Sequence, residues 1–328
     1  MQSQDYPGAK WSVGQRVRGG TDAGVDEAFS SGRILRTHVL RPTWHFVSRE
    51  DIRWLLRLTA PRVHALNAYQ NRALGLDGRL FAQAHSIFVG ALEGGRQLTR
   101  AELAAELAKR GIVARGQRLA YIVAHAELEA LICSGALRGK QQTYALLEER
   151  APAARALDRE EALAELTRRF FVSHGPATLK HFAWWSGLTM ADGKAGLSMA
   201  GSELTRFEVD GIVYWAGASE LRPRRMPARA WLIPEYDEAL IGAKDLGVPD
   251  LPRTRRRWQD IWHRPVMLEG RRAGTWRRTV AGNRLVVKVN LFAALDAGQR
   301  RLLDAATERY ARFLGLPTAS ASWGPGRP

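Results

Sequence analysis

Cysteine is almost missing from this sequence, which has one such residue, Cys133, in 328 positions. A single thiol forms no intramolecular disulfide and builds no cysteine-rich zinc or iron–sulfur site. Long apolar runs are missing too, because no stretch approaches the roughly 18 consecutive apolar residues of a membrane-spanning helix. The first residues also lack the charged and apolar regions of a secretory signal. We therefore expect a cytoplasmic protein with no metal, no cofactor and no membrane insertion.

Acidic residues are scarce relative to basic ones: 33 Asp and Glu stand against 49 Lys and Arg, for a net charge of +16. This excess points to a polyanionic partner, either nucleic acid or an anionic membrane surface. Only seven of the basic residues are lysines, and the rest are arginines. The planar fork of arginine suits phosphates and guanine edges, although a GC-rich coding sequence explains the same bias. With 45% hydrophobic residues, the chain is globular, with about two domains or three small ones.

One pattern, helices followed by a β-hairpin, occurs three times, and its middle copy is the clearest. The segment Thr99–Glu102 is a capping box, so a helix begins at Thr99. Gly111 ends that helix, and apolar residues at helical spacing predict a second helix over 117–133. The glycine-centred basic segment 137–146 predicts a hairpin. Helix, turn, helix and hairpin together make a winged helix, whose second helix enters a DNA groove.

The third copy begins near Asp158, with a helix that ends at Gly175. We expect a further helix over 177–185, because proline at position 176 is tolerated in a first helical turn, and Thr189 is a candidate cap for one more. The segment 204–215 carries the strongest hairpin signal, since its central Asp-Gly tolerates the positive φ angles of a tight turn.

The first copy is partial. It has a short helix over 25–30, and two extended runs within 34–47 that break at Arg41-Pro42. Ser48–Asp51 then caps another helix. After residue 222 the pattern changes to short strands and a terminal helix near 299–314. We predict an α+β fold, mainly α, of tandem winged helices and a C-terminal β-rich unit, with these segments: 1–95, 96–156, 157–221 and 222–328.

Stacked winged helices with excess arginine present a basic face, so duplex DNA is the expected partner of a monomeric protein. For any single arginine, a solvated surface charge is the alternative. His38 and His45 either contact phosphate or a flipped nucleotide, or pack beside Trp44. Most tryptophans, including Trp184 and Trp185, are expected to fill the core. The candidate DNA contacts are Arg36, His38, Arg41, Thr43, His45, Arg118, Arg138, Lys140 and Arg206.

Three motifs occur in order along the chain. They are Gln2-Ser3-Gln4-Asp5-Tyr6-Pro7 with Lys10-Trp11, then His38–His45, then Trp231–Asp237. In this order they resemble the winged-helix family of AlkZ-type DNA glycosylases, over nearly the whole chain. The resemblance implies three tandem winged helices that form a basic DNA-binding cradle. It also implies hydrolysis of N-glycosidic bonds of alkylated or crosslinked purines, with Gln2 and Gln4 in the catalytic Gln-x-Gln motif.

A pair of glutamines suits only a substrate with a good leaving group. An amide orients water and stabilises charge, but it is a negligible base compared with a carboxylate. A purine alkylated at N7 or N3 is cationic and departs readily, leaving an oxocarbenium-like sugar. Residues two apart share a face in an extended segment but not on a helix. We therefore expect Gln2 and Gln4 to lie in extended chain or at the entry to a helix.

Three carboxylates close to these motifs leave alternatives open. Asp5, Glu235 and Asp237 are candidate general bases, or else helix caps and ion-pair partners. The alternative function is a non-catalytic winged-helix DNA-binding protein, such as a transcriptional regulator.

Overall fold

The computed structural model describes residues 1–218, 228–241, 264–316 and 318–325. Its fold is mixed, about 49% helical and 21% strand. The contacts within the chain divide it into two compact units. One consists of Glu27–Leu221, and the other joins Met1–Asp26 to Arg222–Pro328. Among the described residues, no helix is long and apolar enough to cross a membrane.

The unit Glu27–Leu221 opens with a hairpin and a long helix. Strand β1 (Ile34–His38) pairs antiparallel with β2 (Trp44–Ser48), with His38 opposite Trp44. The break at Arg41-Pro42 lies between these strands, as predicted. Helix α3 (Ile52–Ala73) begins after Asp51 without a side-chain cap, so the predicted cap over Ser48–Asp51 is wrong. Trp54 and Leu56 of α3 are buried in the core of this unit.

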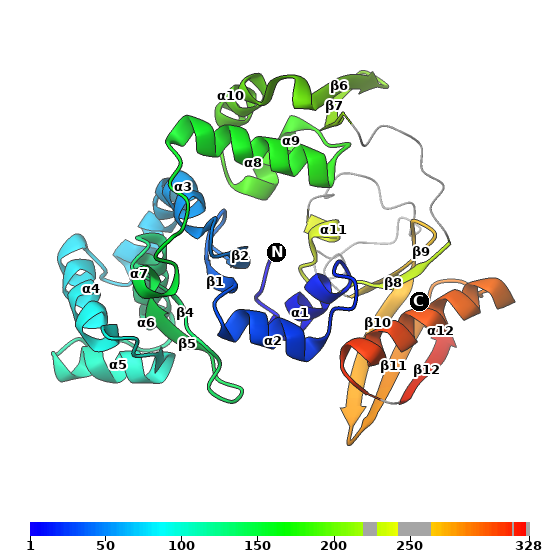
Figure 1. Cartoon of the computed structure of the whole chain (residues 1–328), viewed down its shortest axis with the longest axis horizontal. Coiled ribbons are helices and arrows are strands. Elements are labelled where there is room, and N and C mark those ends of the chain that lie inside the picture. The colour runs from blue at the N-terminus through cyan, green and yellow to red at the C-terminus, as the bar shows by residue number, and fades with distance from the viewer. Residues whose placement is uncertain (219–227, 242–263, 317, 326–328) are drawn as a thin grey trace. The chain divides into compact units, whose positions relative to one another are not determined.

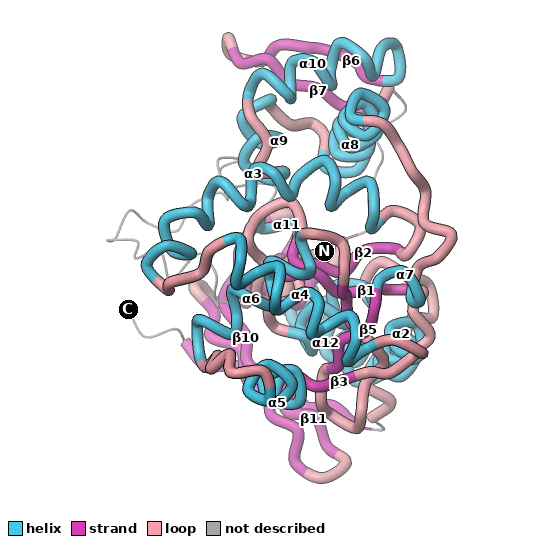
Figure 2. The backbone as a smooth tube through the Cα atoms, turned by 90° about the vertical axis from the view of Figure 1, so that its left-hand side faces the viewer, coloured by secondary structure: helices cyan, strands magenta, loops and turns pink. Residues whose placement is uncertain are grey.

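The middle of the same unit carries helices around a small sheet (Figure 2). Thr99 and Glu102 form the predicted capping box at the start of α5. The sheet has the order β3-β5-β4, and β5 is antiparallel to both neighbours. The elements of this region are α4 (Gly78–Leu92), β3 (Leu98–Thr99), α5 (Arg100–Lys109), α6 (Gly116–Leu128), β4 (Ile132–Ser134), β5 (Thr143–Leu146) and α7 (Leu147–Arg150).

Two predicted boundaries in this region are wrong. Helix α6 ends at Leu128, not at 133, because Ala130 has a φ of 56° and the next residues enter β4. Ile132 and Cys133 are fully buried in strand β4, so these apolar residues belong to a sheet and do not extend the helix. The first strand of the predicted hairpin is therefore Ile132–Ser134. Residues 137–142 form the turn, in which Arg138 and Gln141 make an isolated bridge.

The last part of this unit repeats helices and a hairpin. Helix α8 (Arg159–His174) begins where the sequence predicts and is capped by Asp158, and the candidate cap Thr189 caps α10 (Met190–Ala200). Helix α9 (Leu179–Ser186) starts later than predicted, because the Thr178 hydroxyl caps it by accepting from the N–H of His181. A single turn, η1 (Gly201–Glu203), then precedes the predicted hairpin of β6 (Leu204–Val209) and β7 (Ile212–Gly217).

The other unit is built on a five-stranded sheet of order β12-β11-β10-β9-β8. Helix α12 contacts β8 and β12, and Figure 1 shows it lying along the sheet. Asp296 caps α12 through a capping box, close to the predicted start of the terminal helix. The strands and short helix are β8 (Ala230–Leu232), α11 (Glu238–Ile241), β9 (Pro265–Leu268), β10 (Arg271–Ala281), β11 (Arg284–Leu291) and β12 (Thr318–Pro325), and α12 spans Ala297–Phe313.

Residues from the start of the chain complete the core of this sheet unit. Helix α1 (Tyr6–Gly14) contacts α12, and Trp11 of α1 lies 4.7 Å from Tyr310 between ring centroids. The indole N–H of Trp11 donates to the carbonyl of Leu232 at 2.7 Å. Lys10, almost fully buried, pairs with Asp22 of α2 (Asp22–Ser30) at 2.7 Å. The four predicted segments are finer than these two units and stay predictions; their boundary at 221/222 lies outside the described residues.

Candidate functional site

Gln2 and Gln4 lie immediately before α1, in the non-helical segment that the sequence predicts. Gln2 is 6% exposed and Ser3 between them is fully buried. The side-chain amide of Gln4 donates from Nε2 to Oε1 of Gln2 at 3.3 Å. The two amides therefore lie on the same side of the chain, as residues two apart do in an extended segment. Oε1 of Gln4 is buried and has no hydrogen-bond partner among the described residues.

Glu238, which belongs to none of the sequence motifs, holds this segment in place. The backbone N–H of Gln2 donates to Oε1 of Glu238 at 3.1 Å. Glu238 is the first residue of α11 and is 8% exposed. It lies 236 positions from Gln2, so no local sequence pattern pairs them. The one available signal was its position directly after the Trp231–Asp237 motif.

Asp237, a candidate general base, instead makes an ion pair with the half-exposed Arg16. It is fully buried and lies 2.7 Å from Nη2 of Arg16. The hydroxyl of Ser12 in α1 donates to its other oxygen at 2.5 Å, and the N–H of Ala239 donates to Oδ1 at 2.9 Å. These contacts join α1 to α11, and so support the Gln2–Glu238 contact. The ion-pair interpretation fits Asp237.

Asp5 and Glu235 share one partner, Arg264. Oδ2 of Asp5 lies 3.2 Å from Nη2 of Arg264, and Oε1 of Glu235 lies 3.9 Å from its Nε. The structure therefore gives both carboxylates ion-pair partners, the second of the two alternatives that the sequence left open.

A basic cavity of about 490 Å³ lies beside this ion pair, within the sheet unit. Arg264, Arg277 and Arg278 line it, and Glu235 is its one acidic lining residue. Burial lowers the pKa of Arg278, and the neighbouring Arg264 lowers it further. An excess of guanidinium groups around a cavity favours an anion such as a phosphate. Neither Gln2 nor Gln4 lines this cavity.

The β1–β2 hairpin brings five candidate DNA contacts together. The Arg36 guanidinium lies 4.1 Å from the ring centroid of Trp44, as in a cation–π contact. The His38 ring lies 4.5 Å from the Trp44 ring, and its Nδ1 pairs with Glu127 of α6. Arg41, in the turn, donates to the carbonyl of Trp184 at 3.1 Å.

His45 and Thr43 are less accessible. His45 is 1% exposed, and its Nδ1 lies 3.0 Å from the carbonyl of Thr43, so the structure shows the packed alternative for this histidine. The hydroxyl of Thr43 is buried and has no partner among the described residues. DNA contact by either residue stays a prediction.

The remaining candidate contacts differ in whether their basic side chains already pair with another group of the protein. Lys140 is exposed in the turn between β4 and β5. Arg138, in the same turn, pairs with Glu102 at 2.7 Å, and Arg206 pairs loosely with Glu208 at 3.6 Å. Arg118 donates to the carbonyl of Leu74, just after the C-terminal end of α3. Arg118 therefore has a structural contact in addition to any DNA contact.

One tryptophan expected in the core is exposed. Trp184 of α9 is 42% exposed, and its carbonyl accepts from Arg41. Trp185 beside it packs against the core, as predicted. The apolar run around residue 184 predicted burial of both tryptophans. Consecutive residues of a helix point in different directions, so burial of Trp185 leaves Trp184 exposed. An exposed aromatic next to an arginine is suited to stacking on a base.

Comparison with known proteins places the chain in a family. Residues 1–313 match the AlkZ-like DNA glycosylases. The solved structure of the DNA glycosylase AlkZ of Streptomyces sahachiroi has a similar fold, with a TM-score of 0.78 and 21% sequence identity. That likeness covers 99% of this chain and 91% of the other. No curated protein matches the sequence. Since the family match spans nearly the whole chain, the protein belongs to the AlkZ-like family of DNA glycosylases, which are hydrolases.

Proposed function

We propose that this glycosylase hydrolyses the N-glycosidic bond of cationic alkylated or crosslinked purines in duplex DNA. We further propose that it works in the cytoplasm as a monomer, and that its reaction uses no metal. The observation that carries the proposal is the contact between the amides of Gln2 and Gln4 in a buried segment beside α1. A fixed pair of amides positions water, and a fixed water is what a reaction with a good leaving group requires.

The reaction assigned to this pair breaks the bond between C1′ and the ring nitrogen of the purine. The electron pair of that bond stays with the purine and neutralises its positive charge. The sugar becomes oxocarbenium-like, and the oxygen of water bonds to C1′ and loses a proton to solvent. The buried Oε1 of Gln4, which lacks a hydrogen-bond partner among the described residues, is the acceptor that we assign to this water.

DNA binding is assigned to tandem winged helices in the unit Glu27–Leu221. In the middle copy, α6 would be the helix that enters a groove, and the turn over 137–142 would be the wing. Lys140 and the half-exposed Arg138 lie on that turn, which supports contact with phosphates. Exposed Trp184, beside Arg41, would stack on an unpaired base.

A Gln2→Ala/Gln4→Ala double variant tests the proposed reaction. The substrate is a duplex with one 7-methylguanine, the control substrate is the undamaged duplex, and the readout is free base under single-turnover conditions. We expect wild-type protein to release 7-methylguanine and the variant to release it at least about 100-fold more slowly, the scale of lost positioning. The Gln83→Ala variant, which alters an exposed glutamine of α4, should keep the wild-type rate.

Two outcomes would contradict the proposal. Release at the wild-type rate by the double variant would remove the glutamine pair from the mechanism. Binding to one DNA sequence without base release from any alkylated duplex would favour the alternative, a non-catalytic winged-helix regulator.

A further inference from the structure

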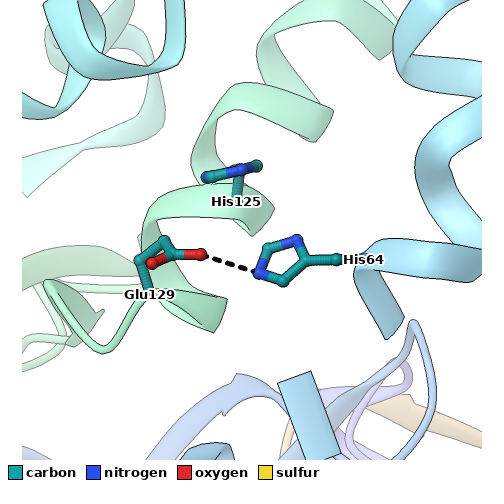
Figure 3. Close-up of side chains that lie close together, drawn as sticks. All are labelled: His64, His125 and Glu129. Atoms are coloured by element: carbon teal, nitrogen blue, oxygen red, sulfur yellow. Dashed lines mark ion pairs between the residues drawn. The ribbon is translucent and has the colours of Figure 1, made fainter. Parts of the chain in front are cut away.

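Three histidines from three helices meet one glutamate in the unit Glu27–Leu221. His64 belongs to α3, His85 to α4 and His125 to α6, while Glu129 directly follows α6. Figure 3 shows His64 pointing across to Glu129, with His125 one turn away on the same helix as Glu129. None of these residues has a part in the proposed reaction.

The donor atoms of this cluster are close enough to share one ion. His64, His125 and Glu129 each offer a ligand atom, and these atoms all lie within 4.8 Å of one another. Nε2 of His64 lies 2.9 Å from Oε1 of Glu129. Ligand atoms on a tetrahedral zinc lie about 3.3–3.5 Å apart, given Zn–N and Zn–O distances of about 2.0–2.2 Å. Small side-chain rotations therefore bring all three atoms to one cation.

The backbone positions two of these side chains as a pair. His125 and Glu129 are four residues apart, so they lie on the same face of a helix, one turn from each other. The N–H of Glu129 donates to the carbonyl of His125 at 2.9 Å, which continues the helical hydrogen bonding to this residue. The His125 ring stacks on Phe81 at 3.7 Å between centroids, which limits its rotation.

His85 supports the ring of His125. Nε2 of His85 lies 3.2 Å from Nδ1 of His125. With Nδ1 occupied by this contact, Nε2 of His125 remains for a ligand. A histidine that binds a metal ordinarily uses its other ring nitrogen in such a hydrogen bond, which fixes the orientation of the ring.

Glu129 is the one carboxylate of the cluster, and a carboxylate oxygen together with imidazole nitrogens is a donor set that zinc accepts.

We propose that His64, His125 and Glu129 bind a divalent cation of the zinc type, with His85 as the positioning residue for His125. Imidazoles together with one carboxylate favour Zn²⁺, and Co²⁺ in its place, over Mg²⁺ or Ca²⁺, which prefer all-oxygen sites. The bound ion joins α3 to α6 and stabilises the folded chain, because it binds the native state only. This site is independent of the proposed reaction at Gln2 and Gln4.

Metal titration of the full chain tests the site. Protein stripped with a chelator is titrated with Co²⁺ and followed by visible absorption, and then with Zn²⁺ by calorimetry. We expect one ion per chain, the intense visible bands of four-coordinate Co²⁺, loss of these bands on adding Zn²⁺, and a melting temperature that rises with Zn²⁺ but not with Mg²⁺. Absence of stoichiometric binding would overturn the proposal.

Two variants and two matched controls locate the ion. Glu129→Gln and His64→Asn alter side chains that are 47% and 26% exposed, and each should weaken Zn²⁺ binding at least tenfold and abolish the Co²⁺ bands. Glu106→Gln on α5 and His174→Asn on α8 change a carboxylate and an imidazole outside the cluster and should leave binding unchanged. Far-ultraviolet circular dichroism establishes that each variant folds. Undiminished binding by the Glu129→Gln variant would show that the ion is held elsewhere and would refute the site.

Discussion

At the scale of single residues, the position of the two candidate catalytic amides depends on contacts made by other residues. A Gln side chain has several rotatable bonds, and ordering it costs entropy that a fixed backbone reduces. The backbone of Gln2 is tied to Glu238, and Asp237 next to it is tied to Ser12 and Arg16. We infer that Glu238 is a positioning residue for the proposed reaction, because its Oε1 accepts from the backbone N–H of Gln2 and lies 3.5 Å from the N-terminal ammonium of Met1.

Replacing Glu238 tests this role at the same scale. Glu238→Ala removes the acceptor of the Gln2 N–H, so kcat for release of 7-methylguanine should fall roughly tenfold to a hundredfold with little change in KM. Glu238→Gln keeps a carbonyl oxygen in the same place and should recover most of the rate. Equal loss in both variants would indicate that the negative charge, and not the hydrogen bond, matters.

At the scale of secondary structure, the start of a helix is set by residues close together in the sequence. The packing of one helix on another depends on residues that are far apart in the sequence. Thr99, Asp158 and Thr189 each cap a helix through a side-chain oxygen; the cap at Thr99 was predicted from the residues that follow it, and Thr189 was a candidate cap. Contact between α8 and α10 depends instead on a missing side chain. A Cβ at Gly196 would lie 2.9 Å from Cβ of Thr167 and 3.2 Å from the carbonyl oxygen of Leu163.

Gly196→Ala should therefore destabilise the protein, although alanine is the better helix former. Overpacking between two helices costs about 1–3 kcal/mol, more than the helix-propensity gain of up to about 1 kcal/mol. Gly90→Ala is the matched control, because Gly90 is also helical but has no atoms within 4 Å of its added Cβ. Denaturant unfolding measures both, and Gly90→Ala should be neutral or stabilising. Equal stability of the two variants would contradict close α8–α10 contact.

At the scale of the whole molecule, ion pairs join carboxylates to arginines of distant helices in the described part of the chain. Arg169 of α8 lies 2.7 Å from Asp51 before α3 and 2.7 Å from Glu165. Burial alone raises the pKa of Asp51, but hydrogen bonds from Arg169, Trp54 and Ser48 more than offset it, so the pKa is below its usual value. Burial also raises the pKa of Glu165, and Arg168 and Arg169 more than offset it.

Acid should therefore destabilise the fold through this cluster. Since the pKa values of Asp51 and Glu165 are lowered on folding, their contribution is present above the ordinary values of 3.8 and 4.5. It is lost as the pH falls through the lower folded values. We expect the melting temperature to fall steeply below about pH 4.5, and the fall to be shallower in an Arg169→Met variant than in an Arg301→Met control. Parallel curves for both variants would show that Arg169 does not cause the acid sensitivity.

Much of the local structure was predictable from the residues alone. The capping boxes, the Asp-Gly turn between β6 and β7 and the break at Arg41-Pro42 are all set by side chains within a few positions of one another. The errors occurred where tertiary context overrode local pattern. Ile132 and Cys133 continue the apolar pattern of α6, yet they are buried in a sheet.

Of the candidate site, the sequence by itself determined the two amides, their spacing and the non-helical segment that places them on one side, because these depend on neighbouring residues. The residues that contact these amides were decided by tertiary structure alone. Gln2 contacts Glu238 because the first residues of the chain pack with the C-terminal sheet in one unit. The histidine cluster is of the same kind, since His64 and His125 come from separate helices. Contacts between distant residues follow from how apolar faces pack, and spacing along the chain does not encode that packing.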